Sequence, residues 1–182
     1  MIITISGKAG SGKSTIAKIL AEKLELKHYS AGDFRRLKAK ELGMTIEQYN
    51  KKGEKDFSTD KQADDWQTEI GKTQNNFIID GRTSYHFIPN SVKIFFDVSP
   101  EKGAERIIKD SSNRPEEQFS SISEAMIEWE NRNKSDSKRY KQYYNIDPYA
   151  NLQKQYDLVL DTSNLTIEEV VKKVLEFVQN KA

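Results

Sequence analysis

The chain has 182 residues, with 29 Lys and Arg against 28 Asp and Glu and without a cysteine. The near-neutral charge argues against a protein that binds nucleic acid mainly through electrostatics, since such proteins carry a basic excess, and the lack of cysteine excludes a disulfide framework and a thiolate metal site. The length predicts one domain, residues 1–182, with a core of its own.

Apolar runs and helical patterns alternate along the chain. The apolar runs predict strands at residues 2–6, 27–29 (a weaker pattern), 77–80, 92–98 and 158–161. The patterns between them predict helices at residues 13–24, 33–42, 60–72, 100–108 and 166–179. This alternation predicts an α/β fold of three layers, in which a parallel sheet of about five strands is covered by helices on both faces. Ligands of such sheets bind at the carboxyl ends of the strands.

The segment "GKAGSGKST" follows the first predicted strand and opens the first predicted helix. Its spacing, Gly7-x4-Gly12-Lys13-Ser14, is typical of a phosphate-binding loop. Glycine lets the backbone turn its N–H groups inward, and the helix start adds a positive end. We expect Lys13 to reach the β- and γ-phosphates of a nucleoside triphosphate and Ser14 to bind Mg²⁺. The residues expected at this site are Gly7, Lys8, Ala9, Gly10, Ser11, Gly12, Lys13, Ser14 and Thr15.

Charged residues also follow the second predicted strand. In "HYSAGDFRRL", Gly32 and Asp33 predict a tight turn, and the helix after it carries Arg35 and Arg36. These arginines are either solvated side chains of a capped helix or a second phosphate site that faces the first.

The third predicted strand ends in "FIIDGRT", with Asp80-Gly81-Arg82. A carboxylate at this point can hold a Mg²⁺-bound water beside the phosphate loop. Arg82 can bind a phosphate through two parallel hydrogen bonds. The alternative interpretation is an ordinary Asp-Gly turn.

Residues 109–150 break the alternation with a long, polar and mostly helical segment, which we interpret as a lid. Its most informative pattern is a series spaced 4, 3, 4, 3 and 4, which one face of a continuous helix would carry. The series is Ala125, Trp129, Arg132, Asp136, Arg139 and Tyr143. Because the face begins apolar, we expect it to point inward despite its charged middle; the alternative is a solvated charged face.

Together these motifs resemble those of the nucleoside monophosphate kinases, and "SAGDFRR" places Arg36 at the arginine of the adenylate kinase motif Ser-Thr-Gly-Asp-x-x-Arg. The chain is most similar to the archaeal-type cytidylate kinases, along nearly its whole length. The signatures of that family stand here as "SAGD", "GR", "RYKQYYNID" and "YDLVLDTS". Two positions depart from it: Asp80, where Glu is usual and bacterial cytidylate kinases have Asp, and Thr83, where Leu is usual.

The resemblance implies transfer of the γ-phosphoryl group of ATP to CMP or dCMP, with Mg²⁺ as cofactor. It implies a core at 1–30, 73–108 and 151–182, an acceptor-binding region at 31–72 and the lid at 109–150. The catalytic residues it implies are Lys13, Arg82, Arg132 and Arg139. The implied acceptor site is Ser30, Gly32, Asp33, Arg36, Lys61, Arg82, Arg132, Asp136 and Arg139. Arg106 would contact ATP, and Arg114 could also reach its phosphates.

Three other functions remain open. An adenylate or uridylate kinase would differ only in its base pocket. "NKSD" at 133–136 looks like the guanine-reading motif of a GTPase, although it lies in a polar helical stretch rather than after a strand. The third is a nucleic-acid-associated ATPase adaptor, but the near-neutral charge argues against this function.

The expected partners are nucleotides only. No apolar run approaches the roughly 20 residues that cross a bilayer, and the first predicted strand starts too early for a signal peptide to precede it. We therefore expect a monomeric cytoplasmic protein that contacts neither membrane nor nucleic acid. His28 and His86 lack metal-site spacing, so we expect both to serve packing. We expect the same of Tyr140, Tyr143 and Tyr144 in the lid.

Overall fold

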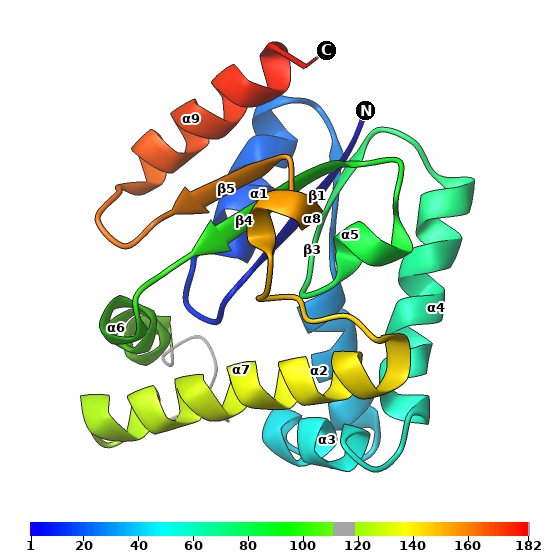
Figure 1. Cartoon of the computed structure of the whole chain (residues 1–182), viewed down its shortest axis with the longest axis vertical. Coiled ribbons are helices and arrows are strands. Elements are labelled where there is room, and N and C mark those ends of the chain that lie inside the picture. Colours follow the sequence, from blue (N-terminus) through cyan, green and yellow to red (C-terminus); the bar gives the residue numbers. More distant parts are fainter. Residues whose placement is uncertain (111–118, 182) are drawn as a thin grey trace.

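The computed structural model describes residues 1–110 and 119–181. It contains a sheet of five parallel strands in the order β2-β3-β1-β4-β5 (Figure 1). The strands are β1 (Ile2–Gly7), β2 (Lys27–Ser30), β3 (Phe77–Asp80), β4 (Val92–Asp97) and β5 (Leu158–Asp161). The predicted α/β class and parallel sheet are therefore confirmed, and each predicted strand agrees with an observed one to within a residue or two.

The central strand β1 is buried on both sides, which explains its unbroken apolar sequence. Ile3 pairs with Ile78 of β3, and Ile5 pairs with Ile94 of β4. One face of the sheet packs against α1 (Lys13–Lys23) and α9 (Ile167–Gln179), whose Ile16, Leu20, Val170 and Val174 join the same apolar cluster. This packing forms the main core.

The opposite face of the sheet is covered by α4 (Ser58–Thr73), α5 (Ser84–Phe87) and α8 (Leu152–Gln155). Alternate residues of the strands turn to this side, as the period of a strand requires. Phe77 and Ile79 pack with Ile70 of α4, and Phe95 packs with Tyr85 and Tyr156. The result is the three-layer arrangement that the sequence predicts.

Four more helices surround the end of the sheet where the strands finish. They are α2 (Ala31–Glu41), α3 (Ile46–Gly53), α6 (Pro100–Asp110) and α7 (Ile122–Tyr144). Figure 1 shows α7 running across the bottom of the molecule, with α6 at one end and α3 beneath it. None of the helices in the two described ranges is both long and apolar enough to cross a membrane.

Two local predictions need correction. Gly32 and Asp33 do not form a tight turn but lie in the first turn of α2, because the Ser30 side chain caps that helix by accepting from the Asp33 N–H at 3.2 Å. α3 is not among the predicted helices, although a reciprocal capping box of Thr45 and Gln48 begins it.

Candidate active site

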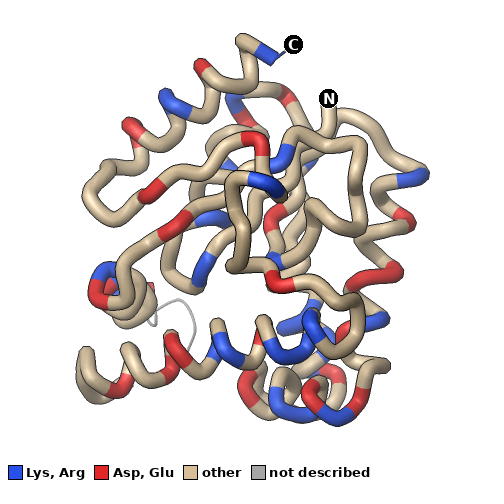
Figure 2. The backbone as a smooth tube through the Cα atoms, viewed as in Figure 1, with Lys and Arg blue, Asp and Glu red and all other residues tan. Residues whose placement is uncertain are grey.

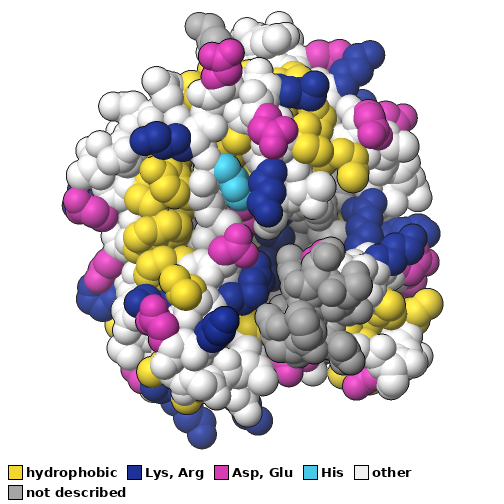
Figure 3. Space-filling model, turned by 180° about the vertical axis from the view of Figure 1, so that it is seen from behind, with side chains coloured by type: hydrophobic (Ala, Val, Ile, Leu, Met, Phe, Trp, Pro, Cys, Tyr) yellow, Lys and Arg dark blue, Asp and Glu magenta, His cyan; other side chains and the backbone are white. Residues whose placement is uncertain are grey.

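A pocket of about 580 Å³ lies at the carboxyl ends of the strands, where the fold predicts a ligand site. Its walls come from the loops after β1 and β3, from α1, α2, α3, α4, α6 and α7, and from the segment that enters α9. Figure 2 shows basic residues along α7 and in the segments beside it. On the rear face, Lys and Arg side chains lie on both sides of a hollow (Figure 3). The pocket is therefore suited to anions.

The phosphate loop turns through backbone conformations with positive φ angles, which glycine adopts without strain. Gly10 and Gly12 have φ angles of +71° and +85°, and Gly12 is the N-cap of α1. A Cβ at position 10 would lie 2.3 Å from the backbone oxygen of Gly103 in α6, so this close approach of the loop to α6 requires glycine at position 10. Lys13 is 8% exposed, and its Nζ donates to the Lys8 carbonyl at 2.7 Å. The first turn of α1 thus opens towards the pocket, as an anion site requires.

Asp80, at the end of β3, is the best-positioned candidate for a metal ligand among the described residues. It is 2% exposed, and its Oδ2 accepts from Ser14 Oγ at 2.7 Å and from Ser30 Oγ at 3.3 Å. Within residues 1–110 and 119–181, no cluster of three His, Cys, Asp or Glu could hold a metal by itself. A hydroxyl beside one carboxylate, with the remaining positions left to water and phosphates, is nevertheless what Mg²⁺ prefers. The residues present fit this ion.

His28 contradicts the prediction of a packing role. Its Nε2 lies 2.7 Å from Asp80 Oδ1, on the carboxylate oxygen that Ser14 does not contact. His28 and Ser30 are two residues apart on β2, and their side chains therefore share a face of the strand. The pairing of β2 with β3 aligns Ser30 with Asp80 and brings both side chains to the carboxylate. No pattern of residue spacing in the sequence predicts this contact between His28 and Asp80.

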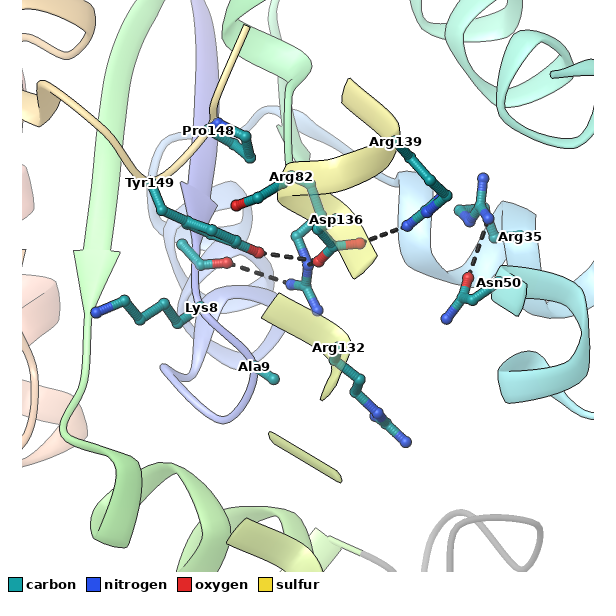
Figure 4. Close-up of polar contacts among 12 residues, drawn as sticks. Lys8, Ala9, Arg35, Asn50, Arg82, Arg132, Asp136, Arg139, Pro148 and Tyr149 are labelled. Carbon is teal, nitrogen blue, oxygen red and sulfur yellow. Dashed lines mark hydrogen bonds and ion pairs between the residues drawn. The ribbon is translucent and has the colours of Figure 1, made fainter. Parts of the chain in front are cut away.

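Charged side chains of alternating sign, buried or half-buried, run from the phosphate loop to α2, and Figure 4 draws Arg82, Asp136, Arg139 and Arg35 of this series. Arg82 Nε donates to Asp136 Oδ2 at 2.6 Å, and Arg82 Nη1 donates to the Gly7 carbonyl at 3.2 Å. Arg139 Nη2 donates to Asp136 Oδ1 at 2.5 Å. Arg139 Nη1 and Arg35 Nη1 both donate to Asp60 Oδ1, the latter at 2.6 Å. We call this set, Arg82, Asp136, Arg139, Asp60 and Arg35, the charge chain.

The charge chain keeps the carboxylate of Asp136 ionised. Burial alone would raise the pKa of Asp136, but the facing guanidiniums of Arg82 and Arg139 lower it below its ordinary value. Tyr149 also donates to Asp136 Oδ2, at 2.9 Å, and burial raises the pKa of this phenol, so it stays a donor. Arg82 is thus held in place while some of its N–H donors remain for a ligand.

The inward face predicted for the lid helix is confirmed. Ala125 is 0% and Trp129 6% exposed, and the Trp129 Nε1 donates to the Ala9 carbonyl of the phosphate loop at 2.9 Å. Arg132 lines the pocket, and its Nε donates to Glu128 Oε1 at 2.8 Å. The "NKSD" sequence lies inside α7 and not after a strand, unlike a guanine-reading motif.

Most predicted site residues line the pocket. They are Ala9, Gly10, Ser11, Gly12, Lys13, Ser14, Thr15, Gly32, Arg36, Asp80, Arg82, Arg106, Arg132 and Asp136. Arg36 also pairs with the exposed Asp33 at 2.6 Å. Arg106 donates to the Thr162 carbonyl at 2.6 Å, which ties α6 to the loop before α9.

Six predicted residues are not part of the lining. Gly7 and Lys8 lie at the base of the loop, where Lys8 pairs with Asp97 at 2.7 Å. Ser30 and Asp33 belong to the capped start of α2. Lys61 is exposed and pairs with Asp65 on its own helix, and Arg139 is 2% exposed within the charge chain. Arg114 lies outside the described residues.

The pocket also contains residues that the sequence analysis did not assign to it. Arg35 and Tyr140 both line the cavity, although Arg35 is predicted only as one of two arginines that are either solvated or a second phosphate site, and Tyr140 only as lid packing. Asn50 of α3 and Gln67 of α4 line it as well. The capping box of α3 is a signal that could have located Asn50 on an ordered helix.

Comparison with solved structures supports the fold. The chain resembles an uncharacterized protein from Eubacterium ventriosum with a TM-score of 0.69 and 16% identity, over 98% of each chain. It resembles a shikimate kinase from Bacteroides thetaiotaomicron with a TM-score of 0.65 and 16% identity, also over 98% of each chain. At such identities the likeness shows the fold alone.

Sequence relatives are much closer. The cytidylate kinase of Methanocaldococcus jannaschii is 39% identical, over 99% of this chain and 98% of its own length. The cytidylate kinase of Archaeoglobus fulgidus is 36% identical, over 100% of this chain and 96% of its own length. The model of the cytidylate kinase-like family matches residues 2–164, which include the phosphate loop, Asp80 and the charge chain. The chain belongs to the cytidylate kinase-like family.

Proposed function

We propose that the protein is a nucleoside monophosphate kinase that transfers the γ-phosphoryl group of ATP to CMP or dCMP, giving ADP and CDP or dCDP. The observation that carries this proposal is one pocket that is lined both by Lys13 and Ser14 of the phosphate loop and by Arg36 and Arg82. One cavity thus offers two phosphate sites, as transfer between two nucleotides requires. The full-length relatives named cytidylate kinases support cytosine as the acceptor base.

Catalysis by this pocket would consist of positioning and charge neutralisation, which dominate phosphoryl transfer. Lys13 and the loop N–H groups would hold the phosphates of ATP. Arg36 and Arg82 would align the acceptor phosphate with them, and Arg132 would neutralise charge on the transferred group. The attacking phosphate oxygen is already ionised at neutral pH, so no general base is needed.

Ser14 and Asp80 would hold the magnesium ion through its water and the nucleotide. When bound, Mg²⁺ supplies charge neutralisation at the β- and γ-phosphates. Within the charge chain, Arg139 would act as a positioning residue, because it contacts Asp136 and Asp136 contacts Arg82. We propose the region 31–72 as the acceptor-binding part and α7 as the lid that closes over both nucleotides and excludes water.

A coupled assay with Mg-ATP and AMP, CMP, dCMP, UMP or GMP tests the proposal. CMP or dCMP should give the highest kcat/KM, and Lys13→Ala should abolish transfer while the protein stays folded. A tenfold preference for AMP or UMP, which is about 1.4 kcal/mol of differential transition-state binding, would contradict cytidylate specificity. Near-normal turnover of the Lys13 variant would contradict the phosphate-loop assignment.

A further inference from the structure

Two carboxamide side chains belong to the part of the pocket lining that the structure describes, Asn50 of α3 and Gln67 of α4. Figure 1 places α3 at the opposite end of the molecule from α9, whose first residues close the phosphate-loop side of the pocket. Ile46 and Ala63 add apolar surface beside the two amides. This end of the pocket therefore has the character of a base site, with apolar walls and few polar groups.

The orientation of the Asn50 amide is determined by its neighbour. Arg35 Nη2 donates to Asn50 Oδ1 at 3.0 Å (Figure 4). A guanidinium has donors only, so the amide atom facing it must be the oxygen, whichever way the amide is first assigned. The Nδ2 N–H donors of Asn50 are consequently on the side away from Arg35.

Arg35 is itself immobilised. Its Nη1 pairs with the fully buried Asp60 at 2.6 Å, and the guanidinium lies 5.1 Å from the centre of the Tyr49 ring. The α3 helix is anchored as well, because Tyr143 of α7 donates to the Gly53 carbonyl at 2.7 Å. Arg35, the last residue of the charge chain, thus fixes the orientation of the Asn50 amide. A side chain held in one orientation by rigid neighbours can discriminate between ligands.

The second amide is already engaged on both atoms. Gln67 Oε1 accepts from Ser84 Oγ at 2.6 Å, and Gln67 Nε2 donates to Asp64 Oδ1 at 3.2 Å. Gln67 therefore forms part of the wall, whereas Asn50 lines the pocket with its Nδ2 group on the side away from Arg35.

We propose that Asn50 is a specificity-determining residue that donates from Nδ2 to the ring nitrogen N3 of cytosine in the acceptor. This inference rests on the proposed function. In cytosine N3 carries a lone pair, whereas in uracil it carries a hydrogen, which would oppose the amide N–H. An oriented donor at this position therefore favours CMP over UMP, two acceptors of the same size and charge. Selectivity of this kind arises because a mismatched base leaves buried polar groups unpaired.

The test compares kcat/KM for CMP and UMP in wild type, Asn50→Leu and Asn50→Asp. Leucine removes the donor at similar volume, so the CMP-to-UMP ratio should fall about tenfold. Aspartate offers only acceptors, which suit the uracil N3–H, so the ratio should fall further. Asn131→Asp is the matched control, because Asn131 is exposed on α7 and outside the lining; it should keep the wild-type ratio within twofold.

The outcomes separate the two proposals. If wild type prefers UMP or AMP, the proposed function fails whatever the variants do. If wild type prefers CMP and both Asn50 variants keep its ratio, the inference about Asn50 fails and the proposed function stands. Equal losses of kcat/KM for CMP and UMP would also overturn the inference about Asn50, since this residue would then serve acceptor binding in general. Melting temperature and the KM for ATP report folding, and Asn50→Ala replaces the leucine variant if that variant does not fold.

Discussion

At the scale of single residues, the contact between His28 and Asp80 has the most direct consequence for the proposed metal site. Its bond to Asp80 Oδ1 holds the carboxylate so that Oδ2 faces Ser14. His28→Leu should free the carboxylate to rotate, at a cost on the order of 1 kcal/mol, or about fivefold in the affinity for Mn²⁺ with ADP. The free Mn²⁺ signal in electron paramagnetic resonance measures that affinity without turnover.

Two further variants separate positioning from a general loss of structure. Glutamine can donate from a similar position, so His28→Gln should recover most of the affinity. In an Asp80→Asn background, His28→Leu should have little additional effect, because the histidine would act only through the carboxylate. An equal loss in both backgrounds would show that His28 does not work through Asp80.

Asp64 makes stability depend on pH. Burial raises its pKa to about 7, although Tyr144 lowers it by donating to Oδ2 at 2.8 Å. The folded state thus binds the proton more tightly than the unfolded state, and stability is lost as pH rises from about 4 through about 7. Asp64→Asn should remove this loss. Relative to wild type, its free energy of unfolding should rise by about 2 to 3 kcal/mol from pH 5 to pH 8. Urea unfolding at both pH values measures this, and parallel pH curves would contradict the assignment.

The sequence revealed those site residues whose chemistry depends on local spacing. Lys13 and Ser14 follow from the pattern of eight consecutive positions, 7–14, and the face of α7 follows from helical periodicity. His28 could not be predicted, because its role arises from the register of β2 against β3. Lys61 was assigned by resemblance alone, and it pairs with Asp65 outside the pocket.

At the scale of elements, α6 and α7 meet the phosphate loop through a small-residue contact. A Cβ at Gly103 would lie 2.4 Å from the Trp129 indole nitrogen and 3.2 Å from the Ala9 carbonyl. Gly103→Ala should therefore break the Trp129–Ala9 hydrogen bond and push α7 away from the loop. We expect a loss of about 1–3 kcal/mol in stability and a higher KM for ATP, with the KM for CMP less affected.

Trp129→Phe is the comparison variant for this contact. It removes the N–H donor and keeps most of the ring, so it should reproduce the change in ATP binding with a smaller loss of stability. Steady-state kinetics and thermal unfolding of both variants provide the measurements. An unchanged KM for ATP in both would mean that α7 does not position the loop.

Element boundaries were predictable where capping and periodicity agreed, as in α9 with its Thr166–Glu169 capping box. α2 begins earlier than predicted, because Ser30 caps it directly from the end of β2. α3 was missed because it spans only Ile46–Gly53, too short for a convincing apolar period. The helices at the mouth of the pocket were thus harder to predict than the core.

At the scale of the whole molecule, the charge chain joins α2, α4, α7 and the loop after β3. Asp60 is 0% exposed and separates Arg35 from Arg139. Asp60→Asn would leave the guanidiniums of Arg35 and Arg139 facing each other without a carboxylate between them, so we expect a loss of about 3–5 kcal/mol in the free energy of unfolding. Asp65→Asn on the same helix breaks only the exposed pair with Lys61 and should cost about 0–1 kcal/mol.

Denaturant unfolding of the two aspartate variants measures this difference. Replacing Arg139 by Met in the Asp60→Asn protein removes one of the facing charges, and it should recover part of the lost stability. If the Asp60 variant is no less stable than the Asp65 variant, the charge chain does not hold these elements together.

The strand order also has a consequence for the newly made chain. β1 leaves the ribosome first, yet its sheet neighbours β3 and β4 begin only at Phe77 and Val92. β2 is made next but cannot pair with β1, because β3 lies between them. At roughly 5–20 residues per second, the apolar run of β1 waits about 4–15 s for a partner strand. Until β3 is made, β1 has no strand beside it and can be shielded only by helices such as α1, so slow codons between β1 and β3 would lengthen the period in which nascent chains can aggregate.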